Sequence, residues 1–202
     1  MKITDIKQQA KRQDRYSVFV DGKYSFPLSE EELLAQDLKI GQEFNKAELE
    51  AIKDEAVIDK GAYRVLDLIS RRPRSRWEIE DYLKRKNYKP EEVEKIIKKI
   101  NKKGYIDDLS FAKRWIENRR LLKSTSKLKL RMELRQKRVE EEFIQRALEN
   151  DEADDQEVIK DLIAKKRSQT RYQDEKKLIA YLARQGFNYS DIKDALKDTE
   201  QQ

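Results

Sequence analysis

The sequence predicts a mainly α-helical protein with three tandem three-helix, helix-turn-helix-like repeats in an extended or curved array. A small α+β region with a β-hairpin precedes them. Of the 202 residues, 43% are charged and 37% hydrophobic, with only five glycines and three prolines, which is typical of helix-rich proteins with small cores. Segments about 50 residues apart share one hydrophobic pattern, which indicates repeats. Alternating hydrophobicity near the N-terminus indicates strands.

The N-terminal region predicts a β-hairpin. In RYSVFVDGKYSFPL, two alternating runs flank Asp21 and Gly22, a pair suited to a type I′ turn. Residues 2–10 predict a third strand. In each hairpin strand three side chains are expected to share one face: Tyr16, Val18 and Val20 in the first strand, and Tyr24, Phe26 and Leu28 in the second.

Two capping boxes then predict helices. Ser29 with Glu32 precedes a short helix, and Asn45 with Glu48 precedes a longer helix that runs towards Ile69. In a capping box each of the two side chains accepts a backbone N–H that the helix itself leaves without a partner. Because this region buries little core alone, we expect it to pack on the segment that follows.

The repeat becomes visible when three segments are aligned without gaps. They are SRWEIEDYLKRKNYKPEEVEKII from Ser75, SKLKLRMELRQKRVEEEFIQRAL from Ser126 and DEKKLIAYLARQGFNYSDIKDAL from Asp174. Each begins with an N-cap residue type, and apolar residues four apart place one stripe of each helix inward. A further helix precedes each segment, with expected core residues Tyr63, Leu66 and Ile69, then Phe111, Trp115 and Leu122, then Val158, Leu162 and Ile163.

The expected divisions of the chain are 1–55 for the N-terminal region and 56–106, 107–153 and 154–202 for the repeats. Each repeat is too small to be stable without its neighbours. The residue after each second helix bears on how that helix ends. Asn87 and Gly186 adopt a left-handed conformation at low cost, whereas Arg138 does not, so the ending in the middle repeat stays open.

Charge is concentrated in the first two repeats. The net charge is +6, yet residues 60–138 carry 26 basic and 11 acidic side chains, or +15, and residues 139–161 carry 2 and 10, or −8. A block of +15 predicts an anionic partner, either nucleic acid or an acidic protein surface, with a solvated face as the alternative. The candidate binding residues are Arg71, Arg72, Arg74, Arg76, Lys84, Arg85, Lys127, Arg131, Arg135 and Arg138.

Two groups stand out among these candidates. Four arginines between Arg71 and Arg76 precede a helix that starts at the capping box of Ser75 and Glu78. Since a helix N-terminus favours anions, this crowding predicts a bound phosphate or carboxylate. The other group, Lys127, Arg131, Arg135 and Arg138, falls within about 80° of one helix face. Pairing of this stripe with glutamates elsewhere is the alternative.

Enzymatic chemistry is not expected. The chain has no histidine, the usual general base, and no cysteine, so nucleophilic cysteine catalysis and thiolate metal sites are excluded. It also lacks a phosphate-binding P-loop. One of Asp107 and Asp108 is expected to cap a helix, and the acidic run 151–155 is expected to be a solvated linker rather than a cation site. We expect no cofactor and no metal.

Sequence-specific duplex binding is a competing function, because three-helix units resemble helix-turn-helix modules. In such modules the last helix often enters the major groove, but here those helices begin PEEVEKI, EEEFIQRAL and YSDIKDAL. Their glutamates would repel phosphates, which favours backbone-level or protein contacts. Trp77 and Leu128 occupy equivalent positions and predict packing between repeats, with stacking of Trp77 on a base as the alternative.

The chain lacks an apolar run of the roughly 18 residues that span a bilayer and lacks a signal-peptide pattern. We therefore expect no membrane contact. We also expect the protein to be cytoplasmic and monomeric.

The chain resembles the RecX family over roughly residues 60–200. The resemblance depends on the triple unit and on SRRPRSRWEIEDYLKRK, GYIDDLSFAKRWIENR and LRMELRQKRV in this order. It departs from the family at Arg138, where the family usually has glycine. The resemblance implies a non-enzymatic modulator that binds the RecA recombinase filament on single-stranded DNA and limits its recombination, ATPase and co-protease activities. The alternative is a DNA-binding protein that acts without a recombinase.

Overall fold

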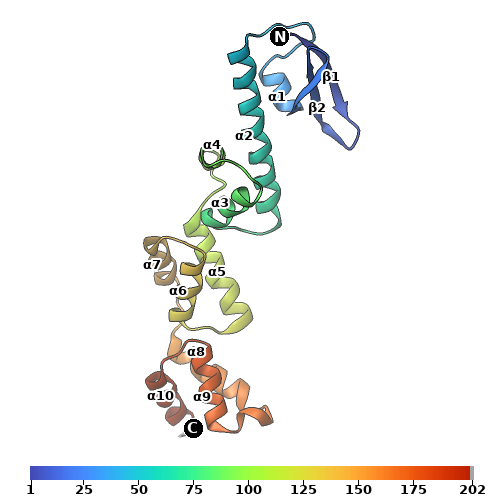
Figure 1. Ribbon diagram of the computed structural model, residues 1–202. Coiled ribbons are helices and arrows are strands. Elements are labelled where there is room, and N and C mark those ends of the chain that lie inside the picture. The colour runs from blue at the N-terminus through green and yellow to red at the C-terminus, as the bar shows by residue number, and fades with distance from the viewer. Residues whose placement is uncertain (201–202) are drawn as a thin grey trace. The chain divides into compact units, whose positions relative to one another are not determined.

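The computed structural model describes the backbone of residues 1–200 and their side chains except those of Lys123 and Glu200. Its elements, shown in Figure 1, are β1 Ile3–Gln9, β2 Arg12–Val20, β3 Lys23–Ser29, α1 Glu30–Ala35, α2 Lys46–Arg71, α3 Arg76–Arg85, α4 Pro90–Lys102, α5 Asp108–Lys123, α6 Lys127–Gln136, α7 Glu141–Glu149, α8 Asp155–Arg167, the 3-10 turn η1 Thr170–Tyr172, α9 Glu175–Arg184 and α10 Tyr189–Glu200. The predicted class, mainly α with an N-terminal antiparallel sheet, is confirmed.

The chain forms two compact units. The first consists of Met1–Arg72 and Glu80–Tyr105, and the second of Pro73–Ile79 together with the described chain from Ile106 onward. The division falls inside α3, whose first residues group with the second unit.

The N-terminal sheet has the order β1-β2-β3, and both pairings are antiparallel. The predicted third strand is therefore present as β1. Positive φ angles of 48° at Asp21 and 78° at Gly22 fit the predicted type I′ turn. The predicted side-chain face is wrong at Tyr24, which is 57% exposed. A bulge in the β2–β3 pairing places Tyr24 opposite Phe19, so the two rings meet on the outer face.

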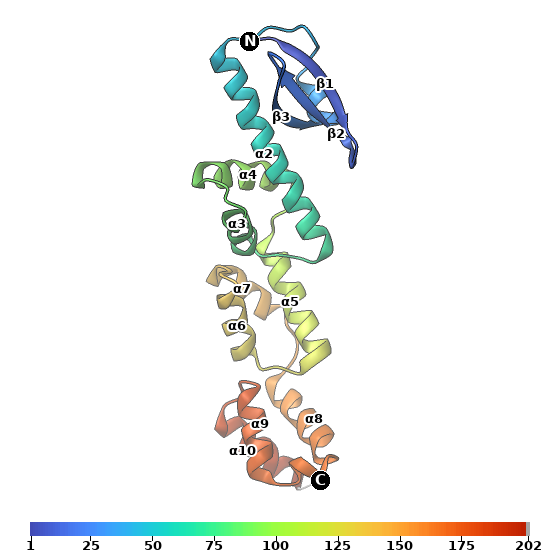
Figure 2. The same cartoon turned by 45° about the vertical axis from the view of Figure 1, so that its right-hand side comes forward.

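The inner face of the sheet packs on the first part of α2. Val18, Phe26 and Leu28 from the sheet are buried with Leu49 and Ala56 from this helix, and Figure 2 shows the sheet beside α2. Both capping boxes are formed as predicted. Since α2 continues to Arg71, one helix serves both the sheet and the first repeat.

The second part of α2 packs on α4. A side chain at Gly61 would collide with Ile96, so only glycine permits this approach of the two helices. The prediction that Tyr63 is a core residue is wrong, because its surface is 47% exposed. It lies on the face of α2 that points away from the buried Val65.

The second and third repeats each have a separate core. Phe111 and Ile116 of α5 pack with Leu130 and Leu134 of α6 and with residues of α7. The core of the third repeat contains Ile159, Leu162, Ile163, Leu178, Leu182, Phe187, Ile192, Ala195 and Leu196. Leu122 was predicted to be core and is 76% exposed. It lies in the last turn of α5, beyond the cluster that α6 and α7 cover.

All three second helices end in the same way. Asn87, Arg138 and Gly186 have φ angles of 63°, 55° and 90°. In the middle repeat the Arg138 N–H donates to the Arg135 carbonyl at 2.9 Å and the Val139 N–H donates to the Leu134 carbonyl at 3.2 Å. These bonds define a Schellman motif, which satisfies helix-end carbonyls. The question left open at Arg138 is answered, because arginine adopts the left-handed conformation there.

Candidate interaction surface

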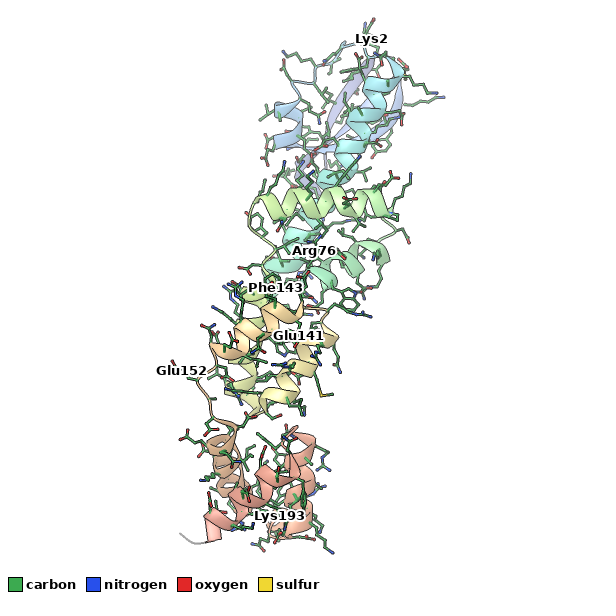
Figure 3. All side chains as sticks on the ribbon, turned by 90° about the vertical axis from the view of Figure 1, so that its left-hand side faces the viewer. Lys2, Arg76, Glu141, Phe143, Glu152 and Lys193 are labelled. Carbon is green, nitrogen blue, oxygen red and sulfur yellow. The ribbon has the colours of Figure 1, made fainter. Side chains whose placement is uncertain are left out.

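The arginine-rich segment leads into α3 through Ser75, which is buried. Ser75 and Glu78 form the predicted capping box, with both bonds at 3.3 Å. The Ser75 hydroxyl also donates to the Lys137 carbonyl at 2.8 Å. The N–H of Arg76, labelled in Figure 3, donates to Asp108 Oδ1 at 2.8 Å. The anion at this helix end is therefore a carboxylate of the chain itself.

The four arginine side chains of this segment differ in exposure. Arg71, Arg72 and Arg76 are exposed, and Arg71 forms an i,i+4 ion pair with an aspartate at 2.8 Å. The Arg74 side chain is only 22% exposed and lies 3.9 Å from a Glu78 carboxylate oxygen. Arg71 and Arg72 belong to the first unit, and Arg74 and Arg76 belong to the second. Arg74 thus has a mainly structural position.

Lys84 and Arg85 lie in the last turn of α3, and both are exposed. Arg85 pairs with Asp81 one turn earlier at 2.8 Å. Cations at this end of a helix also interact favourably with its dipole. These two residues share the first unit with Arg71 and Arg72.

The predicted stripe on α6 is partly neutralised. Arg131 and Arg135 both pair with Glu141 at the start of α7, at 3.1 Å and 2.8 Å, and Glu141 is labelled in Figure 3. Hydrogen bonding to Arg135 lowers the pKa of Glu141. Lys127 donates to a backbone carbonyl at 3.1 Å, and Arg138 is exposed. The glutamate alternative is correct for Arg131 and Arg135, which share the single carboxylate of Glu141.

On α6, exposed apolar side chains lie to one side of this stripe. Leu128 and Met132 of α6 are 50% and 52% exposed, and Trp77 of α3 is 38% exposed. The prediction that Trp77 and Leu128 are buried between repeats is therefore wrong. The result is a mixed basic and apolar face on α6, a composition found at protein interfaces.

Both Asp107 and Asp108 cap a helix, whereas the sequence predicted a capping role for one of them. Asp107 accepts the N–H of Ser110 at 2.9 Å and so caps its own helix, α5. Asp108 instead accepts the first N–H of α3, which Arg76 provides. Burial raises the pKa of Asp108, while the bond from Arg76 opposes that shift.

The same contact recurs between the second and third repeats. Asp155, at the start of α8, accepts the N–H of Lys127 at 2.9 Å. The Ser126 N–H donates to the Gln185 carbonyl at 3.2 Å. Ser126 is equivalent to Ser75 and Gln185 to Lys137, where the donor is the serine hydroxyl. Gly186 allows this contact, because a Cβ there would lie 2.5 Å from Ser126 Oγ. A carboxylate from one helix start thus caps another helix in both places.

The prediction of a solvated linker at 151–155 is wrong for Asp151 and Asp155, whereas Glu152 and Asp154 are exposed. The Asp151 side chain is only 7% exposed, and its Oδ2 lies 2.6 Å from Arg120 Nη2. Arg120 also contacts Asp155 at 3.3 Å and the Thr125 carbonyl at 2.5 Å. The carboxylates are therefore used in packing the third repeat on the second, which a sequence pattern alone does not reveal.

Sequence reasoning missed a group of cations in the first unit. Arg12 and Arg15 of β2 and Lys60 and Arg64 of α2 line one cavity. Arg12 and Arg15 were missed because residues 1–59 as a whole are acidic, with 9 basic and 13 acidic side chains. The available signal was the i,i+4 spacing of Lys60 and Arg64, which places like charges on one helix face.

A second cavity of about 530 Å³ in the same unit is lined by carboxylates of α1 and α2. Burial raises the pKa of Glu32 to about 7, and the adjacent Asp59 adds to the shift. Among the described residues no group of three or more potential ligands could hold a metal ion. Within the same residues, none of the helices is both long and apolar enough to span a membrane.

Comparison with known proteins places four family models along the chain. Residues 1–45 match the RecX N-terminal domain, and residues 63–99, 107–148 and 153–196 match the first, second and third RecX three-helix domains. A solved structure described as regulatory protein RecX has a TM-score of 0.73 and 32% identity, covering 96% of this chain and 98% of that one. RecX from Lactobacillus salivarius, with TM-score 0.61 and 20% identity over 72% of this chain and 98% of its own, shares the fold.

Regulatory proteins RecX from two Bacillus species match nearly the whole chain. The protein of Bacillus pumilus is 30% identical over 97% of this chain and 76% of its own length, and that of Bacillus subtilis is 30% identical over 98% and 77%. The Listeria monocytogenes RecX is 36% identical over 76% of this chain, and the match spans 58% of that relative. With all four domains matched in order, the chain belongs to the RecX family of non-enzymatic regulatory proteins.

Proposed function

We propose that this protein binds the RecA recombinase filament on single-stranded DNA and limits its recombination, ATPase and co-protease activities. The observation that carries the proposal is the face of α6, where Arg131, Arg135 and Arg138 lie beside exposed Leu128 and Met132. Phosphates alone would use the cations, whereas a protein surface with acidic and apolar groups would use both kinds of side chain.

The remaining predicted residues add positive charge in both units, Arg76 in the second and Arg71, Arg72, Lys84 and Arg85 in the first. Exposed Arg71, Arg72 and Arg76 and the pair Lys84 and Arg85 supply further positive charge around α3. Such charges accelerate association with an acidic partner more than they increase final affinity. We therefore assign them to the first encounter with the filament and the α6 face to the stable contact.

DNA binding without a recombinase is the second candidate. It is supported by the +15 block of residues 60–138. The third helices oppose operator reading, because α4 begins with Glu91 and Glu92 and α7 begins with Glu141 and Glu142. Glutamates at these helix starts disfavour phosphate there. Any binding to bare DNA is thus expected to be weak and independent of sequence.

Co-sedimentation with RecA filaments and with bare single-stranded DNA, each titrated across salt, tests the proposal. We expect filament binding to be at least about 10-fold tighter than binding to bare DNA and to persist at higher salt, because apolar contacts are not screened. The ATPase rate of the filament should fall in parallel. Equal affinity for both targets, with the same salt dependence, would favour the second candidate.

A further inference from the structure

We propose that a cavity lined by residues of the three strands and of α2 binds the phosphodiester backbone of single-stranded nucleic acid. This cation cavity has a volume of about 290 Å³ and is lined by Gln9, Arg12, Arg15, Tyr24, Pro27, Lys60 and Arg64. All lie in the first unit, outside the set of basic residues discussed for the filament. The choice of single-stranded DNA as occupant rests on the proposed function.

The lining is unusually one-sided in charge. Four of its seven residues are cationic, and none of them carries a carboxylate. Lys60 and Arg64 are one turn apart on α2, an arrangement that destabilises a helix unless an anion lies between them. Arg12 and Arg15 approach from β2. A bound phosphate would interact favourably with all four.

Arg15 gives the strongest indication of a missing anion. Its residue surface is only 6% exposed, and among the described side chains its Nε is a buried atom without a hydrogen-bond partner. A buried charged donor without a partner is costly, and native structures rarely retain one without a ligand or water to satisfy it. Arg15 also lines the neighbouring cavity of about 530 Å³ with Glu30, Glu32 and Asp59. Because none of these carboxylates accepts a hydrogen bond from its Nε, this atom is left to an acceptor from outside the chain.

The surrounding field agrees with this geometry. Burial lowers the pKa of Lys60, and the charges of Arg64, Arg15 and Arg12 lower it further. These three guanidinium groups are thus close enough to Lys60 to oppose its charge. An anion in the cavity would reverse this effect and restore the pKa of Lys60 towards its ordinary value.

Exposed aromatic rings favour nucleic acid over an acidic protein as the occupant. Tyr24 lines the cavity and is 57% exposed, and Tyr63 is 47% exposed. The Arg12 guanidinium lies over the Tyr63 ring, 5.6 Å from its centroid. Aromatic rings beside a positively charged groove are the usual platform on which bases of single strands stack. A glutamate-rich peptide would gain nothing from either ring.

The test compares two double variants of α2 that remove the same charge. Lys60→Gln with Arg64→Gln changes the cavity, and Lys46→Gln with Lys53→Gln changes the same helix outside it. Anisotropy of a labelled thymidine oligomer gives the affinity. We expect the cavity variant to bind at least about 10-fold more weakly, with a salt slope reduced by about 1.4, because each single-strand phosphate contact contributes about 0.7. The control should change less than about twofold.

Two further measurements identify the occupant. Tyr24→Ala should weaken oligomer binding at least about fivefold, since stacking on one ring is lost. Polyglutamate of equal charge should compete poorly. Effective competition by polyglutamate with no effect of Tyr24→Ala would assign the cavity to an acidic protein, and equal losses in the two double variants would show binding by net charge alone. Either result overturns the proposal.

Melting temperatures guard against a folding artefact. Removal of Lys60 and Arg64 relieves repulsion but also removes the hydrogen bond from Arg64 to the Tyr88 hydroxyl, so the cavity variant should melt within a few degrees of the wild type. Filament co-sedimentation of the wild-type protein separates this inference from the proposed function. If the wild type ignores filaments while oligomer binding still depends on Lys60 and Arg64, the proposed function fails and the cavity assignment stands. Unchanged oligomer affinity in the cavity variant would overturn the cavity assignment, whatever the filament measurement shows.

Discussion

Arg138 shows how one residue stores strain in a repeated motif. Its φ of 55° places it in the left-handed region, where Asn87 and Gly186 occupy the equivalent positions. This conformation costs a residue with a Cβ about 1–2 kcal/mol. The surrounding Schellman bonds and the acceptance of the Ser75 hydroxyl by the Lys137 carbonyl hold the turn in place. The arginine is therefore retained at some cost in stability.

Arg138→Gly is expected to stabilise the protein by about 1 kcal/mol, because glycine adopts a positive φ without strain. Urea unfolding followed by circular dichroism measures the change. Arg138→Ala is the matched control, since it removes the charge and keeps the Cβ, and its stability should equal that of the wild type. A gain in the alanine variant as well would attribute the effect to charge rather than to backbone conformation.

Glu32 makes stability depend on pH. Its pKa is raised from 4.5 to about 7 by burial and by Asp59, against the bond from the Ser29 N–H. The folded state therefore binds a proton more tightly than the unfolded state does. This contribution is fully present below pH 4.5 and is lost as the pH rises through about 7.

Glu32→Gln should consequently be about 1 kcal/mol more stable than the wild type at about pH 8, and nearly equal to it at about pH 5. The modest size reflects partial solvent screening. Glutamine can still accept the Ser29 N–H, so the capping box remains. Unfolding curves at both pH values test this, with the exposed neighbour Glu31→Gln as the control that should show no difference. A constant gap between Glu32→Gln and the wild type would disprove the titration.

At the scale of elements, one carboxylate contact is used twice. Asp108 caps the first turn of α3 through Arg76, and Asp155 caps the first turn of α6 through Lys127. In the third repeat Asp174 accepts two N–H groups of its own helix at 2.9 Å and 3.3 Å. A serine N-cap thus occurs where another helix supplies a carboxylate, and an aspartate occurs where α9 must cap itself.

Asp155→Ala should therefore destabilise the second unit by about 1–2 kcal/mol, through loss of a helix cap and of an ion-pair partner for Arg120. Glu157→Ala, an exposed change in the same first turn of α8, should cost less than about 0.5 kcal/mol. Thermal unfolding of both variants gives the comparison. Equal losses in the two would mean that Asp155 acts only through the dipole of α8.

At the scale of the whole molecule, repetition separates structure from function. Leu130 and Leu134 are buried like their counterparts in the other repeats, whereas the four cations of the α6 stripe have no such counterparts in the third repeat. Residues that the fold requires recur at equivalent positions. The stripe does not, which is why it is assigned to a partner.

Arg131→Gln with Arg135→Gln is expected to weaken filament binding at least about 10-fold, or about 1.4 kcal/mol. Glutamine is used because glutamate at both positions would place two further carboxylates beside Glu141. Exposed ion pairs contribute little, so the melting temperature should change by only a few degrees. Lys176→Gln with Lys177→Gln on α9 removes the same charge from the third repeat and should leave binding intact. Equal loss in both variants would remove the stripe from the site.

The sequence alone determined the fold class. Hydrophobic spacing, capping residues and the gapless repeat depend on neighbours within one helix or hairpin, and such local rules can be applied without coordinates. The capping boxes at Ser29, Asn45 and Ser75 and the turn at Asp21 follow directly from residue type. Local rules failed at Tyr24, which a bulge moves to the other face of the sheet. They also failed at Leu122, which lies outside the core of the second repeat.

Only the tertiary structure decided which charges face each other. Asp151 and Asp155 look like a solvated run in the sequence, yet they lie against Arg120. Arg15 and Lys60 are 45 positions apart and belong to different elements, yet they line one cavity. Electrostatic partners are chosen by distance in space, which sequence separation does not encode, whereas hydrophobic periodicity is written along each element. The helices could thus be predicted from sequence, and the cation cavity could not.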